Sequence, residues 1–360
     1  MFVGYYPSWS DNWFSSKTWD GRDYTDAEIL KASKLAQIPG TYTHVVISFA
    51  QPNFSYTTAG NYTANAWTGT GLNFNAGPQD IKRSIDVLHS RNIKVLMAVG
   101  GATYNNWAAL AAEGSNGGPI TTALTKIMLD LGIDGLDVDY EVEGADATRV
   151  AEYAGASRAM RRAVETAGGS RILTMAGWST GAHPNNGTSY WGGSATREYQ
   201  VFTQNPDLPA KLDVVSVMSY DARYEHYDAA VAWKQYRDLF PNTTIVNVGL
   251  ETAPEGWAGG MLVVNDADAQ CDGSKVLANQ YLSGATTPPD GGSYPKAYSV
   301  NRLANYVATS NHPKKNARDG AMLWQILKTA TASCGSATVA SPGTIMTKIN
   351  SLYGLPLDNR

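Results

Sequence analysis

The sequence has few cysteines and few charged residues for its length. Two of its 360 residues are cysteines, Cys271 and Cys334, which is too few for a disulfide framework, and their spacing does not fit a metal site. One disulfide bridge and two buried thiols both stay open. Charged residues make up 17% of the chain, and 28 basic against 32 acidic side chains leave a formal net charge of −4. Because no cationic surface for a polyanion is expected, we predict no nucleic-acid partner.

Long apolar runs are also missing. No stretch approaches the roughly 18 apolar residues of a membrane-spanning helix, so we predict no membrane partner. The first residues, Met1 to Tyr5, lack the basic-then-apolar layout of a signal peptide. Aromatic residues, by contrast, are plentiful and unevenly distributed, with 10 Trp and 20 Tyr against 7 Phe. Since Trp and Tyr combine an apolar face with a polar edge, this composition favours a ligand such as a sugar, which is both stacked upon and hydrogen-bonded.

Eight short runs of apolar and β-branched residues recur along the chain, and no linker separates them. They begin near residues 2, 44, 93, 133, 171, 212, 244 and 321. Segments between them carry the 3.6-residue period of helices, as at Ile81, Ile85 and Leu88. Continuous apolar strands that alternate with helices are typical of a parallel sheet with both faces covered. The pattern predicts an α/β protein with a single (β/α)8 barrel, also called a TIM barrel, over residues 1–360.

Extended loops are expected at one end of this barrel. A barrel of this kind needs about 250 residues, so roughly a hundred are left over for loops. The candidate loops are the aromatic stretch 51–78 and the Pro/Gly-rich part of 251–320. Both follow the carboxyl ends of predicted strands, which is where such barrels build their active sites. We therefore expect the functional residues at the carboxyl face.

Four carboxylates fall within eight residues on the predicted fourth strand, in the segment Asp134-Gly-Leu-Asp137-Val-Asp139-Tyr-Glu141. Strand side chains alternate between faces, so Asp137, Asp139 and Glu141 are predicted to line up inside the barrel while Tyr140 points outward. Buried carboxylates repel one another and are costly to desolvate, so such a column needs shared protons or a compensating ligand. The pattern predicts a catalytic site rather than a solvated acidic strand end.

Two other kinds of site are disfavoured. The segment Gly177–Gly181 matches the G-x-S-x-G pattern of serine hydrolases, but turn-forming residues follow it where a nucleophile elbow needs a helix. Trp178 in this segment is interpreted as a residue that stacks on sugar or packs. A metal ion held by the acid column is disfavoured because alternation spreads the oxygens over about 13 Å. We predict neither a metal site nor a cofactor.

The spacing Asp134-x-x-Asp137-x-Asp139-x-Glu141 resembles the signature of family 18 glycoside hydrolases, the chitinases and their relatives. Segments that resemble the family's other strand motifs are Gly4-Tyr5-Tyr6, Ser48-Phe49-Ala50, Gly100-Gly101, Met218-Ser219-Tyr220-Asp221 and Trp324. The third-strand motif departs from the family pattern, because Ala98 stands where a serine usually helps to hold the innermost acid, here Asp137. The last interval, within 251–320, has room for a reduced form of the small insertion that some members carry between strands seven and eight.

The resemblance implies a chitinase that hydrolyses β-1,4 links between N-acetylglucosamine units with retention, the substrate's own 2-acetamido oxygen being the nucleophile. It assigns Glu141 as general acid and base, Asp139 as the partner of the acetamido group, and Asp137 as the residue that shares a proton with Asp139. Tyr220, on the inward face of the sixth strand, would donate a hydrogen bond to the acetamido oxygen. The substrate-binding candidates are Tyr5, Phe49, Met218, Asp221 and Trp324, with Trp178.

The resemblance further implies a monomeric, extracellular enzyme whose partner is chitin or its oligosaccharides. Two alternatives stay open. An endo-β-N-acetylglucosaminidase acting on glycoprotein glycans shares the signature but would lack tryptophan-lined subsites for a long homopolymer. An inactive chitin-binding lectin shares the fold, but the intact Glu141 argues against it.

Overall fold

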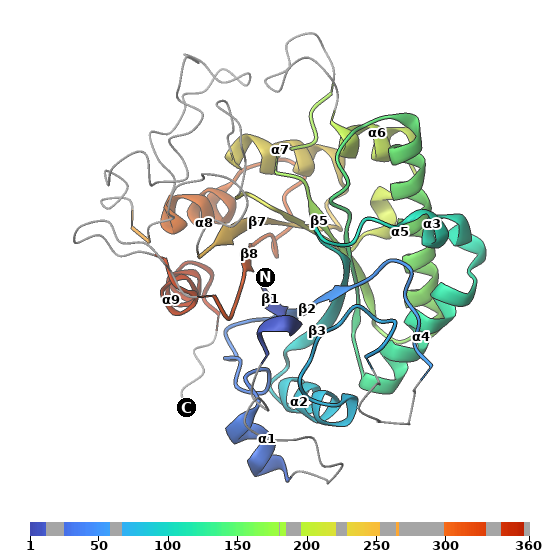
Figure 1. The fold of residues 1–360 in the computed structure, drawn as a ribbon. Coiled ribbons are helices and arrows are strands. Elements are labelled where there is room, and N and C mark those ends of the chain that lie inside the picture. Colours follow the sequence, from blue (N-terminus) through green and yellow to red (C-terminus); the bar gives the residue numbers. More distant parts are fainter. Residues whose placement is uncertain are drawn as a thin grey trace. The chain divides into compact units, whose positions relative to one another are not determined.

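A computed structural model of the chain describes residues 1–11, 25–57, 67–179, 181–184, 196–220, 229–252, 264–265, 299–328 and 340–355. Within these ranges, parallel strands follow one another in sequence order and form a closed barrel (Figure 1). The strands are β1 (Phe2–Pro7), β2 (His44–Ala50), β3 (Lys94–Gly100), β4 (Gly135–Asp139), β5 (Ile172–Gly177), β6 (Val214–Val217), β7 (Ile245–Glu251) and β8 (Ala321–Trp324). Each begins at or close to its predicted position, and the (β/α)8 barrel is confirmed.

Helices occupy the intervals between consecutive strands and follow the last one. They are α1 (Asp26–Ala32), α2 (Pro78–Ser90), α3 (Ala108–Glu113), α4 (Pro119–Leu131), α5 (Ala147–Ala167), α6 (Arg197–Gln204), α7 (Ala229–Leu239), α8 (Val300–Thr309) and α9 (Pro342–Tyr353). None of the helices in the described ranges is both long and apolar enough to cross a membrane.

The chain packs as two compact units. The N-terminal unit consists mainly of Val3–Glu143 and Ala147–Met175, and the C-terminal unit of Met1–Phe2, Gly144–Asp146 and Ala176–Pro356. The prediction of a single domain over residues 1–360 stays a prediction. The proposed insertion within 251–320 falls mostly on residues 253–263 and 266–298, and these lie outside the described residues, as do Cys271 and Cys334.

Helix α2 shows how the sequence builds the N-terminal unit. Pro78 stands in its first turn, where a missing N–H costs nothing, and Asp80 complements the helix dipole there. Ile81, Ile85 and Leu88 are fully buried, which confirms the predicted helical period. Helix α2 packs on β3 and α5 packs on β4, while α4 packs against both of these helices.

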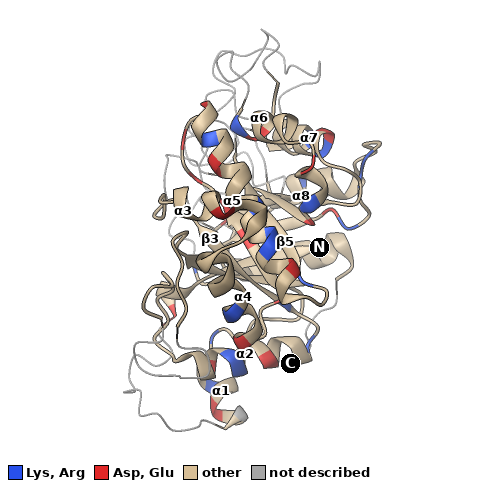
Figure 2. Cartoon of the chain, turned by 90° about the vertical axis from the view of Figure 1, so that its right-hand side faces the viewer, with Lys and Arg blue, Asp and Glu red and all other residues tan. Residues whose placement is uncertain are grey.

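The outer surfaces of these helices carry charges of both signs (Figure 2). Lys82 pairs with Asp86 on α2 at 3.2 Å, and Arg161 pairs with Glu165 on α5 at 3.0 Å. Both are i,i+4 pairs at the surface, which stabilise a helix by a few tenths of a kcal/mol. These helix faces are therefore solvated surfaces of mixed charge.

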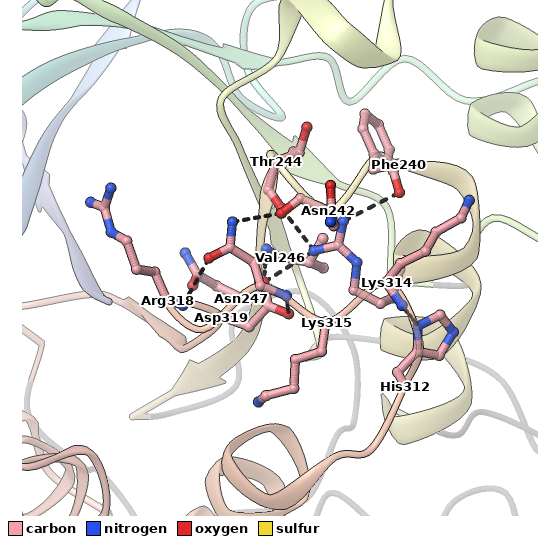
Figure 3. Close-up of polar contacts among 12 residues, drawn as sticks. Phe240, Asn242, Thr244, Val246, Asn247, His312, Lys314, Lys315, Arg318 and Asp319 are labelled. Carbon is pink, nitrogen blue, oxygen red and sulfur yellow. Dashed lines mark hydrogen bonds and ion pairs between the residues drawn. The ribbon is translucent and has the colours of Figure 1, made fainter.

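A buried ion pair lies among the polar contacts drawn in Figure 3, at the amino end of β7. Arg237 of α7 donates to Asp319 Oδ1 at 3.1 Å and to the carbonyl oxygen of Thr244 at 2.8 Å. Asp319 also accepts the backbone N–H of Val246 at 2.7 Å. Burial lowers the pKa of Arg237 and raises that of Asp319. The pair ties α7 to β7 and to the turn before β8, which is a structural role.

Candidate active site

Asp137 lies at the centre of β4 and is 1% exposed. Tyr5 of β1 donates its hydroxyl to Asp137 Oδ2 at 2.8 Å, and Thr174 of β5 donates to Oδ1 at 2.5 Å. Burial raises the pKa of Asp137 to about 6, even though both hydroxyl groups stabilise the ionised form. The innermost acid of the column is therefore a carboxyl group that holds its proton into the mildly acidic range.

The hydroxyl of Thr174 makes up for the serine that the sequence lacks. In the sheet, Asp137 has Ala98 of β3 as its register partner on one side and Thr174 of β5 on the other. Ala98 is fully buried and offers no donor, whereas Thr174 supplies one from the opposite strand. Sequence reasoning did not identify Thr174, although a single hydroxyl in the apolar run of β5 was a usable signal.

Asp139 ends β4, and paired glycines of the neighbouring strand fix its backbone. Gly101 donates its N–H to the carbonyl oxygen of Asp139 at 2.9 Å. At Gly100, with φ +113°, a Cβ atom would lie 2.1 Å from that same oxygen and 2.4 Å from the ring of Trp107. Glycine is therefore required for this close approach. The side chain of Asp139, like that of Asp137, is almost completely buried.

Glu141 follows β4 and is the most exposed acid of the column. Its side chain is partly exposed, against 1% for Asp137 and 3% for Asp139. Tyr140 points the other way, since its ring stacks on Tyr153 of α5. The predicted alternation thus holds for Asp137 and Tyr140, and exposure increases along the chain towards the carboxyl end.

Asp134, the first acid of the motif, takes no part in this column. It precedes β4 and accepts hydrogen bonds from His89 Nε2 at 2.7 Å, Lys94 Nζ at 3.0 Å and the N–H of Val95 at 2.8 Å. Burial pushes its pKa up, but these partners together outweigh burial, and the pKa of Asp134 lies below its usual value. It fastens β4 to β3 and α2 at the amino end of the strand.

The ring of Phe49 lies at the carboxyl end of β2, beside another aromatic group. Trp9, which follows β1, stacks on Phe49 with ring centroids 5.7 Å apart and is 47% exposed. A Cβ atom at Gly101 would lie 2.7 Å from the Phe49 ring, so this glycine also makes room for the aromatic group. Trp9 thus extends the aromatic surface of Phe49 at this strand end, and the role of Phe49 as a wall residue stays a prediction.

A family model described as glycosyl hydrolases family 18 matches residues 1–316. The chain belongs to glycosyl hydrolase family 18. It is therefore a glycoside hydrolase.

Solved structures of two chitinases and an N-acetylglucosaminidase have a similar fold. A chitinase from Pseudoalteromonas aurantia is 16% identical with a TM-score of 0.52, over 98% of this chain and 99% of that one. A Group IV chitinase from Ostrinia furnacalis is 17% identical with a TM-score of 0.51, again over 98% and 99%. An N-acetylglucosaminidase from Paenibacillus barengoltzii is 14% identical with a TM-score of 0.54 over the same shares. At these identities the similarity shows the fold alone.

The C-terminal unit of the family 18 enzyme holds other predicted residues, and its sixth strand is shorter than predicted. Strand β6 ends at Val217, so Met218 and Tyr220 follow the strand, although the N–H of Met218 still bonds the carbonyl oxygen of Gly177 of β5 at 2.8 Å. The inward orientation of Tyr220 stays a prediction. The N–H groups of Ser219 and Tyr220 each bond a carbonyl two residues back, at 2.8 Å, which replaces strand pairing by tight turns. Tyr220 is nevertheless 8% exposed, and its hydroxyl points to Met322 Sδ at 3.7 Å.

The remaining predicted residues of this unit lie at carboxyl ends of strands. Trp324 is the last residue of β8 and is partly exposed. Trp178 directly follows β5, with the guanidinium of Arg197 at 5.3 Å from its ring centroid. Asp221 lies outside the described residues. The substrate-binding roles of these residues stay predictions.

The two rival sites gain no support from the family 18 enzyme's structure. Strand β5 ends at Gly177, and neither 178–179 nor 181–184 is helical, so the strand does not run into a helix as a nucleophile elbow does. Among the described residues, no three His, Cys, Asp or Glu side chains are grouped so that they could hold a metal ion.

Proposed function

We propose that this family 18 enzyme is a chitinase that hydrolyses β-1,4 links between N-acetylglucosamine units with retention. The 2-acetamido oxygen of the sugar attacks its own anomeric carbon while Glu141 protonates the departing oxygen. The same glutamate then takes a proton from the water that opens the intermediate. Substrate assistance of this kind needs an acid at the rim and a buried acid pair beneath it.

The observation that carries the proposal is the gradient of environments along β4. Asp137 is buried, is hydrogen-bonded by two hydroxyl groups and has a pKa of about 6, while Glu141 reaches the partly exposed end. Asp137 can therefore hold or release a proton near neutral pH, as proton sharing with Asp139 requires. Negative charge on Asp139 would then stabilise the cationic ring that forms when the acetamido oxygen attacks.

Further residues are assigned to the sugar by the resemblance to the family. Tyr220 donates a hydrogen bond to the acetamido oxygen, Trp324 stacks beneath the reacting sugar, and Met218 and Asp221 complete its contacts. Tyr5 serves the acid column directly, because its hydroxyl is already bonded to Asp137. Phe49, with Trp178 as a further stacking residue, offers an apolar ring to the C–H faces of the polymer.

The test is the configuration of the first product. NMR spectra taken in the first minutes of hydrolysis of a chitin oligomer should show the β-anomer, and an oligomer with a free 2-amine in the reacting unit should not be cleaved. An α-anomer, or efficient cleavage of the free amine, would refute substrate assistance.

A second comparison tests the substrate class. The enzyme should cleave chitin oligomers much faster than the glycans of a high-mannose glycoprotein. The reverse preference would identify an endo-β-N-acetylglucosaminidase, and binding of chitin without cleavage of either substrate would identify a lectin. The monomeric state and an extracellular location are part of the same proposal.

A further inference from the structure

Tyr140, the residue between Asp139 and Glu141, is enclosed by two aromatic rings on the outer side of β4. Its ring stacks on Tyr153 of α5, with centroids 4.7 Å apart and planes 11° apart. The ring of Trp107, which precedes α3, lies at 5.1 Å with a tilt of 47°. All three side chains are fully buried. Aromatic contacts of this kind fix both the position and the orientation of the ring.

The hydroxyl of Tyr140 has a charged acceptor. It donates to Glu152 Oε2 of α5, whose side chain is 11% exposed. Arg149, one turn earlier on α5, lies 3.4 Å from the same oxygen. Hydrogen bonds from a neutral donor to a carboxylate are stronger than bonds between neutral groups, and burial strengthens them further. The tip of Tyr140 is therefore fixed as firmly as its ring.

These contacts of Tyr140 lie at the point where the regular pairing of β4 ends. The paired residues of β4 end at Asp139, and Gly101 holds the carbonyl oxygen of that residue. Glu141 comes two positions later, after the strand. Tyr140 is thus the point at which the chain between the two acids is tied to the helical layer. The position of a carboxyl group at the end of a strand depends on the peptide that carries it.

We propose that Tyr140 and Glu152 are positioning residues that hold Glu141 in the geometry for protonating the leaving group. The idea rests on the proposed function, in which Glu141 is the general acid. A misplacement of about 1 Å can cost 10²-fold in rate, so a small shift of this peptide is sufficient to matter. In this proposal, the hydrogen bond between Tyr140 and Glu152 is the contact that holds the peptide of Glu141 in place.

The experiment removes that bond and keeps the ring. Tyr140→Phe should lower kcat on a chitin tetramer by about tenfold with KM nearly unchanged, because ground-state binding does not use the proton of Glu141. The matched control is Tyr153→Phe, which removes a hydroxyl from the same stack whose partner is Met175 Sδ at 3.8 Å. This control should keep the wild-type kcat. Melting temperatures of both variants show whether the fold is intact.

A second substrate distinguishes positioning from a loss of stability. An aryl glycoside of the chitin dimer releases a stable phenolate and needs little protonation, so Tyr140→Phe should lose no more than about twofold in kcat/KM on it. Equal losses on both substrates, or a loss below twofold on the tetramer in folded enzyme, would overturn the proposal. If the wild-type enzyme cleaves neither substrate, the proposed function itself is wrong and this proposal with it.

Substitutions of the acceptor, Glu152, give an independent pair of variants. They test the same hydrogen bond even if Tyr140→Phe does not fold. Glu152→Gln keeps an oxygen that can accept the Tyr140 hydroxyl, whereas Glu152→Leu has none. We expect Glu152→Leu to reproduce the leaving-group dependence of Tyr140→Phe and Glu152→Gln to regain most of the lost kcat. Identical behaviour of the two Glu152 variants would contradict the role of the hydrogen bond.

Discussion

Asp134 and Asp137 belong to the same eight-residue motif, yet their environments shift their pKa values in opposite directions. In both carboxyl groups burial by itself acts to raise the pKa, and the hydrogen-bond partners decide the net shift. Asp134 has His89 and Lys94 as charged or chargeable partners, and its pKa ends below the usual value. Among the described residues, the hydrogen-bond donors to Asp137 are the neutral hydroxyls of Tyr5 and Thr174, and its pKa rises to about 6.

The contrast separates Asp134, a structural carboxylate, from Asp137, for which we propose a role in catalysis. Because its folded-state pKa is depressed, Asp134 contributes stability at pH values above its unfolded pKa and loses this contribution as the pH falls through the folded value. Asp137 behaves in the opposite way. Its raised pKa means that its contribution is fully present below the unfolded pKa and is lost as the pH rises through about 6. A group that costs stability near neutral pH is a candidate for a chemical role, and this is the role we propose for Asp137.

The largest expected effect comes from the far end of the column. Glu141→Gln should reduce hydrolysis by about 10²–10⁴-fold, because the amide fills the same space but has no proton to donate. Binding of a chitin oligomer, measured by calorimetry, should persist. Retention of more than about a tenth of the activity would show that Glu141 is not the general acid.

Asp137→Asn tests the chemical member of the pair. We expect a loss on the order of 10²-fold in kcat, because removal of one group that stabilises charge in a water-excluded site typically costs that much. The acidic limb of the pH–rate profile should shift as well. Stability at pH 7 should not fall, since a buried ionisable group is removed. An unchanged rate and an unchanged profile would make Asp137 a bystander.

Thr174→Val sharpens the comparison by removing one neutral donor. Loss of one hydrogen bond, worth roughly 1 kcal/mol, should lower kcat about fivefold and raise the pKa of Asp137 further, so the acidic limb moves to higher pH. Adding Ala98→Ser should restore part of the lost kcat and part of the pKa change, because position 98 on β3 is the register partner of Asp137 on the side away from Thr174. If the double variant resembles Thr174→Val alone, a hydroxyl at position 98 does not reach the acid.

Asp134→Asn should have the smallest effect on activity. We expect kcat near the wild-type value and a loss of about 1 kcal/mol in the free energy of unfolding, because Lys94 and His89 lose a charged partner. Urea unfolding at pH 7 and pH 3 measures it, and the difference between variant and wild type should shrink at the lower pH. A large loss of kcat in fully folded protein would contradict the purely structural role of Asp134.

The sequence was sufficient to predict the barrel, since its strands are apolar on both faces and its helices keep their period, as at Ile81 and Ile85. It also predicted the face on which Asp137 lies, because alternation inside a strand is fixed by covalent geometry. It predicted a sixth strand that was too long, because tight turns at Ser219 and Tyr220 end the strand earlier. It also did not identify Thr174, because contact across strands depends on register, which no local pattern contains.

The most direct test of the account is a carboxyl titration. With ¹³C-labelled aspartate side chains, NMR should show one carboxyl that titrates near pH 6 and is missing in Asp137→Asn, and another that titrates below its usual value and is missing in Asp134→Asn. That pattern is what the environments of the two residues predict. An Asp137 carboxyl that titrates at or below its ordinary value would contradict the assignment of a proton-holding acid at the base of the site.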